Sequence, residues 1–188
     1  MSASQEFSGR VVMVTGGGSG IGASTCRLLA LQGAAVAVVD FDPAAAHQMA
    51  DELRRLSTQA LAIEADVADA KAMQGAVART VDELGNLHLA VNNAGIPSPY
   101  AAVGDLDLDT WSRVLEVNLT GVFVSMRYQI PALLANGGGA IVNLSSDAGI
   151  TGNAGAAIYC ASKGGVVQLV GNSGDGAGHV ANGLGGQG

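Results

Sequence analysis

The sequence predicts an α/β fold, in which a doubly wound parallel sheet is covered by helices on both faces. Short apolar runs alternate along the chain with segments of helical pattern. The apolar runs are continuous rather than alternating, which indicates strands buried on both faces. Polar residues gather directly after these runs, at the edge where such sheets bind their ligands. Right-handed crossovers between about five strands then give the strand order 3-2-1-4-5.

Two strand–helix units open the chain. The apolar run 11–14 predicts a strand, and a glycine-rich turn leads from it into a helix over about residues 21–32. Residues 35–39 predict the second strand. The helix that follows begins at Pro43, because proline is favoured in the first turn of a helix, and extends to about Leu56.

The same alternation continues in the middle of the chain. Residues 60–65 predict the third strand and residues 87–91 the fourth, with a helix over about 70–84 between them. A loop with Pro97 and Pro99 follows the fourth strand. This loop leads to the next predicted helix.

A long helix over about 109–135, a fifth strand at 140–144 and a helix over 159–170 complete the predicted elements. Residues 171–188 are rich in glycine, have no periodicity and offer little apolar surface to bury. Because glycine loses the most backbone entropy when it is ordered, we expect this tail to be disordered or loosely attached. The sequence therefore predicts one domain over residues 1–170.

Composition excludes several classes of function. The formal net charge is −7 with nine basic residues, a poor match for nucleic acid or an anionic membrane surface. No apolar run is long enough to span a bilayer, and residues 1–9 lack the apolar core of a signal peptide. The cytoplasm is the expected location. Cys26, Cys160 and the scattered histidines have no metal-ligand spacing, so no metal is predicted.

The glycine-rich turn at residues 15–22 is the first candidate site. It follows an apolar strand and opens a helix, which is the context in which such a turn binds a dinucleotide pyrophosphate. Glycines allow the backbone to approach the phosphates, and the helix presents free N–H groups with the positive end of its dipole. The alternative is a tight turn without a ligand.

Polar residues at the next strand ends extend this site. A carboxylate at Asp40 can accept hydrogen bonds from both adenosine ribose hydroxyls and would repel a 2′-phosphate. No arginine stands beside it, so NAD is favoured over NADP. Asp66 is a candidate acceptor for the adenine amino group. The alternative for Asp40 is a helix cap or a solvated side chain, and the alternative for Asp66 is the N-cap of the helix that begins near Ala70. Asn92 would tie neighbouring loops together, unless it belongs to a plain turn.

Tyr159 and Lys163 lie four residues apart and share one face of a predicted helix. A free phenol is a poor base at neutral pH because its pKa is about 10, and a nearby ammonium group favours the phenolate. The pair therefore predicts an acid/base device, with an ordinary helix surface as the alternative. Ser146 or its neighbour Ser145 would hydrogen-bond the substrate oxygen or form a turn.

Asn118 interrupts an apolar helical face. A buried amide needs hydrogen-bond partners. We expect it either to hold a water that links Lys163 to solvent or to be satisfied by backbone.

These motifs together resemble the classical type of the short-chain dehydrogenase/reductase family. The resemblance covers about residues 10–170 and rests on the turn at 15–22, on 92–95, on Asn118, on Ser145-Ser146 and on Tyr159 with Lys163. It implies a Rossmann-type, NAD-binding domain that interconverts a secondary alcohol and a ketone by hydride transfer. The implied partner is a small alcohol or carbonyl compound, and the implied assembly is a homo-oligomer.

The resemblance also implies the role of each site residue. The implied catalytic residues are Asn118, Ser146, Tyr159 as acid/base and Lys163. The implied cofactor-binding residues are Gly16, Ser19, Gly20, Ile21, Gly22, Asp40, Asp66, Val67, Asn92, Ala94, Gly95, Tyr159 and Lys163.

The resemblance ends near residue 170. Family members continue with a sixth strand and further elements, and residues 171–188 resemble none of them. We therefore interpret the chain as truncated or altered after about residue 170, which leaves the strand at 140–144 as an open apolar edge. The alternative function is accordingly a weak or inactive dehydrogenase-like chain that at most binds nucleotide or associates with other subunits.

Overall fold

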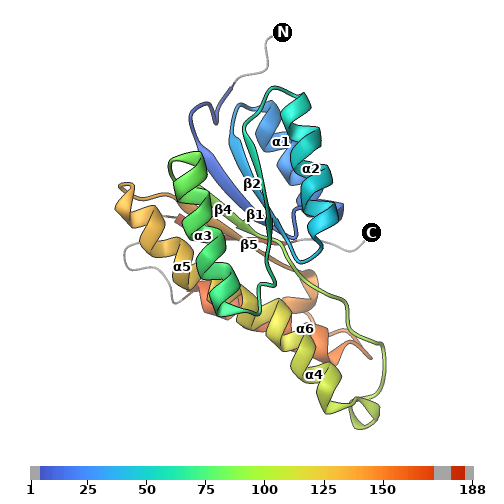
Figure 1. Ribbon diagram of the computed structural model, residues 1–188. Helices are drawn as coiled ribbons and strands as arrows, with labels where there is room; N and C mark the ends of the chain where they lie inside the picture. The colour runs from blue at the N-terminus through green and yellow to red at the C-terminus, as the bar shows by residue number, and fades with distance from the viewer. Residues whose placement is uncertain (1–4, 172–178, 185–188) are drawn as a thin grey trace.

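The computed structural model of the protein describes residues 5–171 and 179–184. A single parallel sheet runs through it, in the order β3-β2-β1-β4-β5-β6 (Figure 1). The strands are β1 (Val11–Thr15), β2 (Ala35–Asp40), β3 (Ala60–Glu64), β4 (Leu89–Asn92), β5 (Ala140–Ser145) and β6 (His179–Leu184). The predicted order 3-2-1-4-5 is thus confirmed, and a sixth strand extends the sheet beyond β5.

The sixth strand corrects the expectation for the end of the chain. β6 pairs in parallel with the whole of β5, from Ala140 opposite His179 to Ser145 opposite Leu184. The prediction of disorder is therefore wrong for 179–184, and the open edge expected at 140–144 is covered in this structure. Strand pairing uses backbone N–H and C=O groups, so an extended segment can satisfy an open edge without an apolar pattern. The rest of the predicted tail, 172–178 and 185–188, lies outside the described residues.

Helices cover both faces of the sheet, as Figure 1 shows. One face carries α1 and α2, and the other carries α3, α5 and α6, as the two groups of core residues indicate. The helices are α1 (Gly20–Leu31), α2 (Pro43–Arg55), α3 (Ala70–Leu84), α4 (Leu108–Leu115), α5 (Gly121–Ala135) and α6 (Ala157–Gly171). Short 3₁₀ turns are η1 (Val103–Asp105) and η3 (Asp147–Gly149).

The long helix predicted over 109–135 is interrupted by a π-helical turn, η2 (Glu116–Thr120). The backbone stays right-handed on both sides of it, at Glu116 and at Gly121. Asn118 sits in the middle of this turn and is fully buried. π turns often occur at functional sites, and periodicity alone gives no signal for one extra residue in a helical turn.

Two aspartates form the N-caps of α2 and α3. Asp42 accepts hydrogen bonds from Ala44 N at 2.9 Å and Ala45 N at 3.3 Å, and so caps α2. Asp69 caps α3 in the same way. The alternative of a capping role for Asp40 or Asp66 is therefore wrong, and both carboxylates are left at the strand ends.

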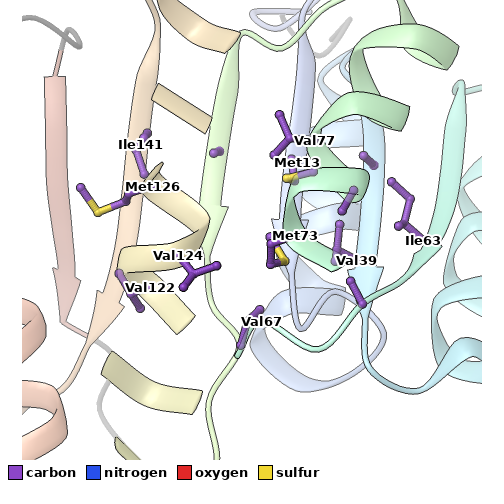
Figure 2. Close-up of a cluster of buried hydrophobic side chains, with 14 of the residues drawn as sticks. Met13, Val39, Ile63, Val67, Met73, Val77, Val122, Val124, Met126 and Ile141 are labelled. Carbon is purple, nitrogen blue, oxygen red and sulfur yellow. The ribbon is translucent and has the colours of Figure 1, made fainter. Parts of the chain in front are cut away.

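The core has two layers, one on each face of the sheet. Figure 2 shows the larger cluster, in which Met13 of β1 lies with Met73 of α3 and Val124 of α5. Val12 and Val14 point to the opposite face and pack with residues of α1 and α2. All five side chains are at most 7% exposed, which confirms that the strands are buried on both faces.

Candidate active site

A cleft of about 370 Å³ lies at the carboxyl edge of the sheet. This is the edge where the polar residues of the sequence were expected to converge. The cleft is lined by Gly16, Ser19, Gly20, Ile21, Asp40, Phe41, Ala65, Asp66, Val67, Asn93, Ala94, Gly95, Ile96, Arg113 and Val117. The structure therefore brings most of the expected cofactor-binding residues into one cavity, although Gly22, Asn92, Tyr159 and Lys163 lie outside its lining.

The glycine turn leaves no room for side chains. A Cβ atom at Gly22 would lie 2.0 Å from the carbonyl oxygen of Gly16, and one at Gly16 would lie 2.9 Å from Cα of Ala94. Gly16 and Gly20 also have positive φ angles of 61° and 52°, a region that glycine adopts at little cost. Gly22 thus lets α1 pack closely against the turn.

Helix α1 begins in the cleft with Ser19 as its N-cap, and the Ser19 side chain makes no capping bond within the described residues. The first turn of α1 contains no acidic side chain. Free N–H groups and the positive end of a helix dipole favour an anion. The turn and the start of α1 therefore fit the pyrophosphate of a dinucleotide.

Asp40 also lines the cleft, beside the glycine turn, and is 7% exposed. Its Oδ2 accepts a hydrogen bond from Gly18 N at 2.9 Å, and its Oδ1 accepts one from Asp42 N at 3.1 Å. Each carboxylate oxygen keeps a further lone pair. The glycine turn therefore fixes a carboxylate that can still accept hydrogen bonds from a diol such as a ribose.

Asp66 is held by a partner that the sequence analysis did not identify. Its Oδ1 accepts a hydrogen bond from Ala68 N at 2.9 Å, and its Oδ2 pairs with Nη2 of Arg113 at 3.0 Å. Burial acts to raise the pKa of Asp66, but the Ala68 N–H and the Arg113 guanidinium outweigh it and hold the pKa below its ordinary value. Arg113 lies on α4, so no local pattern links it to Asp66.

The contact between neighbouring loops that was expected of Asn92 is made by the next residue, Asn93. Asn93 ties the loops together, because its Nδ2 donates to the carbonyl oxygens of Thr15 at 3.1 Å and Gly16 at 3.0 Å. Asn92 points instead into the core, where it bonds the amides of Gln129 and Asn143. The loop-tying role therefore belongs to Asn93, and Asn92 is a core residue in this structure.

A second cavity, of about 200 Å³, contains Tyr159 and Ser146. Its lining is Pro97, Ser98, Tyr100, Ser146, Asp147, Ala148, Asn153, Ala156 and Tyr159. The two adjacent serines differ in orientation. Ser145 Oγ donates to the backbone carbonyl of Lys163 at 2.9 Å, whereas Ser146 Oγ donates to Asp147 Oδ1 at 2.8 Å and faces this cavity. Of the two serines, the geometry favours Ser146 for contact with a substrate.

Lys163 lies close to one residue of each cavity. Its Nζ donates to the carbonyl oxygen of Leu144 at 2.8 Å and lies 5.8 Å from the ring centre of Tyr159. A Cβ atom at Gly95, which lines the larger cleft, would lie 3.6 Å from Nζ. Lys163 is 5% exposed, and burial lowers its pKa to about 8.

Asn118 connects the loop after β4 to helix α6. Its Oδ1 accepts from Ile96 N at 2.7 Å, and its Nδ2 donates to Ile96 O at 2.9 Å and to Ser162 Oγ at 3.3 Å. The backbone of Ile96 thus satisfies this buried amide, as one of the two alternatives expected. The proton path through a water at Asn118 stays a prediction.

Two features of the described residues bear on other functions. Among residues 5–171 and 179–184, no group of histidine, cysteine, aspartate or glutamate side chains is arranged to hold a metal ion. The helices of this same part of the chain are all too short or too polar to cross a bilayer. Cys26 is fully buried beside the glycine turn, and burial raises the pKa of its thiol to about 12.

Comparison with known proteins agrees with the fold. The profile of the short chain dehydrogenase family matches residues 10–176. Cyclohexanol dehydrogenase of Acinetobacter sp. (strain SE19) is 46% identical over 166 residues, which are 88% of this chain and 66% of that protein. Cis-4-hydroxycyclohexanecarboxylate dehydrogenase of Sinomonas cyclohexanicum is 42% identical, with 88% of this chain and 66% of that protein covered.

Solved structures give the same result. The crystal structure of an NAD⁺-bound xylitol dehydrogenase superposes with a TM-score of 0.86 at 33% identity, and covers 88% of this chain and 64% of that one. The present chain spans 66% of the length of the two relatives named above. Because the family profile matches most of the chain, and because these relatives are similar in sequence, the chain belongs to the short chain dehydrogenase family.

Proposed function

We propose that the protein interconverts a secondary alcohol and a ketone with NAD as the hydride carrier. The observation that carries this proposal is that Tyr159 and Ser146 share a small cavity, and that Lys163 lies close both to Tyr159 and to Gly95 of the larger cleft. When bound, the cofactor would accept a hydride from the alcohol carbon. The relatives' names, dehydrogenases of cyclohexanol and of a hydroxycyclohexane acid, support the same class of substrate.

The cofactor would be held by the residues of the cleft. The turn at Gly16, Ser19, Gly20 and Ile21 fits the pyrophosphate, with Gly22 beneath it. Asp40 would accept hydrogen bonds from the adenosine ribose and disfavour a 2′-phosphate, which favours NAD over NADP. The remaining expected contacts are Asp66 and Val67 at the adenine, and Ala94 and Gly95 near the second ribose.

The chemistry at the substrate would rest on three side chains. Tyr159 would take the hydroxyl proton during oxidation and return it during reduction. Lys163, mostly charged at neutral pH because its pKa is about 8, would favour the phenolate of Tyr159. Ser146 would hydrogen-bond the substrate oxygen. Asn118 would keep the loop at Ile96 and helix α6 in register. A homo-oligomer in the cytoplasm remains the expected setting.

The test measures nucleotide binding and turnover in the same preparation. NADH binding is followed by fluorescence, and formation of NADH from NAD⁺ and cyclohexanol by absorbance. Gly95→Val would place a side chain against Asn118 Oδ1, 3.3 Å from an added Cβ, and should abolish both signals. Gly104→Val, at an exposed position with open space around it, should leave both unchanged. Binding without turnover in the unmodified chain would favour the alternative of an inactive nucleotide-binding chain, and binding that survives Gly95→Val would refute the proposed cleft.

A further inference from the structure

An exposed acidic residue lines the small cavity, directly after Ser146. Asp147 begins the turn η3 and lines the cavity together with Tyr159 and Asn153. Its Oδ1 accepts two hydrogen bonds, one from Ser146 Oγ and one from Ala148 N, each at 2.8 Å. Within the described residues, no cation pairs with this carboxylate.

The hydroxyl of Ser146 is committed to Asp147 in this structure. A serine has a single hydroxyl hydrogen to donate, and Asp147 Oδ1 takes it. A simple alcohol or ketone that needs this hydrogen must compete with a charged acceptor, and hydrogen bonds to charged groups are the stronger kind. When Ser146 turns its hydrogen toward a substrate, Asp147 loses the hydrogen bond from Ser146. A second hydroxyl on the substrate can replace that bond by donating to Asp147.

The geometry fits two adjacent hydroxyl groups. Ser146 Oγ and Asp147 Oδ1 lie 2.8 Å apart, a separation comparable to that of the two oxygens of a vicinal diol in its gauche conformation. With the reacting oxygen at Ser146 and Tyr159, the neighbouring hydroxyl reaches Asp147. Ser98, Tyr100 and Asn153 supply further polar groups to the same wall of the cavity.

On the basis of the proposed function, we propose that Asp147 is a specificity-determining residue that selects neutral vicinal diols, and in the reverse direction α-hydroxy ketones. Oxidation converts one CH–OH of the diol to C=O. The hydride leaves carbon for NAD⁺, the hydroxyl proton goes to Tyr159, and the second hydroxyl donates to Asp147 throughout. A carboxylate on the substrate is repelled by Asp147, because the cavity places two like charges close together without a cation between them.

The selectivity is tested with a panel of three substrates. The values of kcat/KM are measured with NAD⁺ for cyclohexane-1,2-diol, cyclohexanol and cis-4-hydroxycyclohexanecarboxylate. We expect the diol to exceed cyclohexanol by about tenfold or more, the usual worth of a hydrogen bond to a charged group. The carboxylate should be the poorest substrate.

Three variants separate the role of the charge from that of the hydrogen bond. Asp147→Val should abolish the preference for the diol and raise the activity on cyclohexanol, because Ser146 regains its free hydroxyl. Asp147→Asn, which keeps an acceptor, should retain part of the diol preference and improve turnover of the carboxylate. Asp105→Val, a control on the exposed turn η1, should leave all three values unchanged.

Binding of the diol in the presence of NADH, measured by calorimetry, makes the test independent of turnover. Asp147-dependent diol binding without turnover supports the specificity assignment and refutes the proposed activity. Equal use of diol and monoalcohol by the unmodified chain, or a diol preference that Asp147→Val leaves intact, overturns the assignment while the proposed activity stands. Absence of both turnover and Asp147-dependent binding overturns both.

Discussion

Asn92 and Gln129 exchange two hydrogen bonds in the core of the protein. Asn92 Nδ2 donates to Gln129 Oε1 at 3.0 Å, and Gln129 Nε2 donates back to Asn92 Oδ1 at 2.9 Å. Asn143 of β5 accepts a further bond from Asn92 Nδ2 at 2.8 Å. All three amides are at most 2% exposed. The pair joins α5 to the end of β4, directly before the loop that lines the larger cleft.

This exchange predicts strong coupling between the two amides. Asn92→Leu leaves the buried amide of Gln129 without its main partner, and should lower the free energy of unfolding by about 2–4 kcal/mol. Gln129→Leu should cost a similar amount. The double variant should cost clearly less than the sum, because neither amide is then stranded. Urea unfolding of the four proteins measures this cycle, with Gln74→Leu as an exposed control; strictly additive losses would show that the exchange is energetically unimportant.

Two helical glycines should respond in opposite directions to alanine. Gly22→Ala forces a Cβ to within 2.0 Å of Gly16 O, so the turn cannot close and the protein should lose both stability and NADH binding. Gly75→Ala adds a Cβ in open space on α3 and should raise the free energy of unfolding by roughly 0.5–1 kcal/mol. Thermal unfolding of the two variants distinguishes these effects. A well-folded Gly22→Ala protein that binds NADH normally would contradict the described turn.

Asp40 should govern the choice between NADH and NADPH. Asp40→Ala removes the carboxylate that would accept from the ribose and repel a 2′-phosphate, so the ratio of the two dissociation constants should move toward NADPH by about tenfold or more. Asp42→Ala is the matched control. It removes the cap of α2 and should cost about 1 kcal/mol of stability without changing the ratio. Equal ratios in all three proteins would remove Asp40 from the cofactor site.

Lys163 makes stability depend on pH in the alkaline range. The unfolded chain keeps the Lys163 proton up to its ordinary pKa of 10.5, whereas the folded chain releases it above about 8. Between these values the unfolded state holds the extra proton, so the free energy of unfolding rises with pH. The total gain is about 3 kcal/mol.

The difference in unfolding free energy between the unmodified chain and Lys163→Met isolates this effect. It should shift in favour of the unmodified chain as the pH rises from about 8 to about 10.5, and stay level below that range. Lys71→Met, at an exposed position, reports the loss of a surface charge. A difference that stays level across the whole range would mean that Lys163 is not desolvated as the structure shows.

Most of the fold could be predicted from sequence patterns, because these patterns reflect burial and backbone geometry. Continuous apolar strands gave the parallel sheet and its order, and glycine spacing gave the turn at Gly16. β6 was not predicted because pairing with an open edge needs only backbone groups, which leave no pattern in the sequence. The π turn at Asn118 escaped because a single extra residue barely disturbs helical periodicity.

Within the site, the sequence located strand ends but could not orient side chains there. Ser145 and Ser146 are chemically identical, and only the position of α6 decides which one bonds the Lys163 carbonyl. Asn92 and Asn93 point to opposite sides of the strand end, one to the core and one to the glycine turn. Arg113 meets Asp66 through tertiary packing of α4, which no local pattern encodes.

The central claim is that Tyr159 is the acid/base group of an alcohol oxidation. The most direct test is the rate of NADH formation from NAD⁺ and a secondary alcohol by Tyr159→Phe, with Tyr128→Phe on α5 as the control and NADH binding measured in parallel. The account predicts that Tyr159→Phe lowers the rate by about 10²–10⁴-fold with NADH binding unchanged, and that Tyr128→Phe retains full activity. A Tyr159→Phe protein that oxidises the alcohol as fast as the unmodified chain would contradict it.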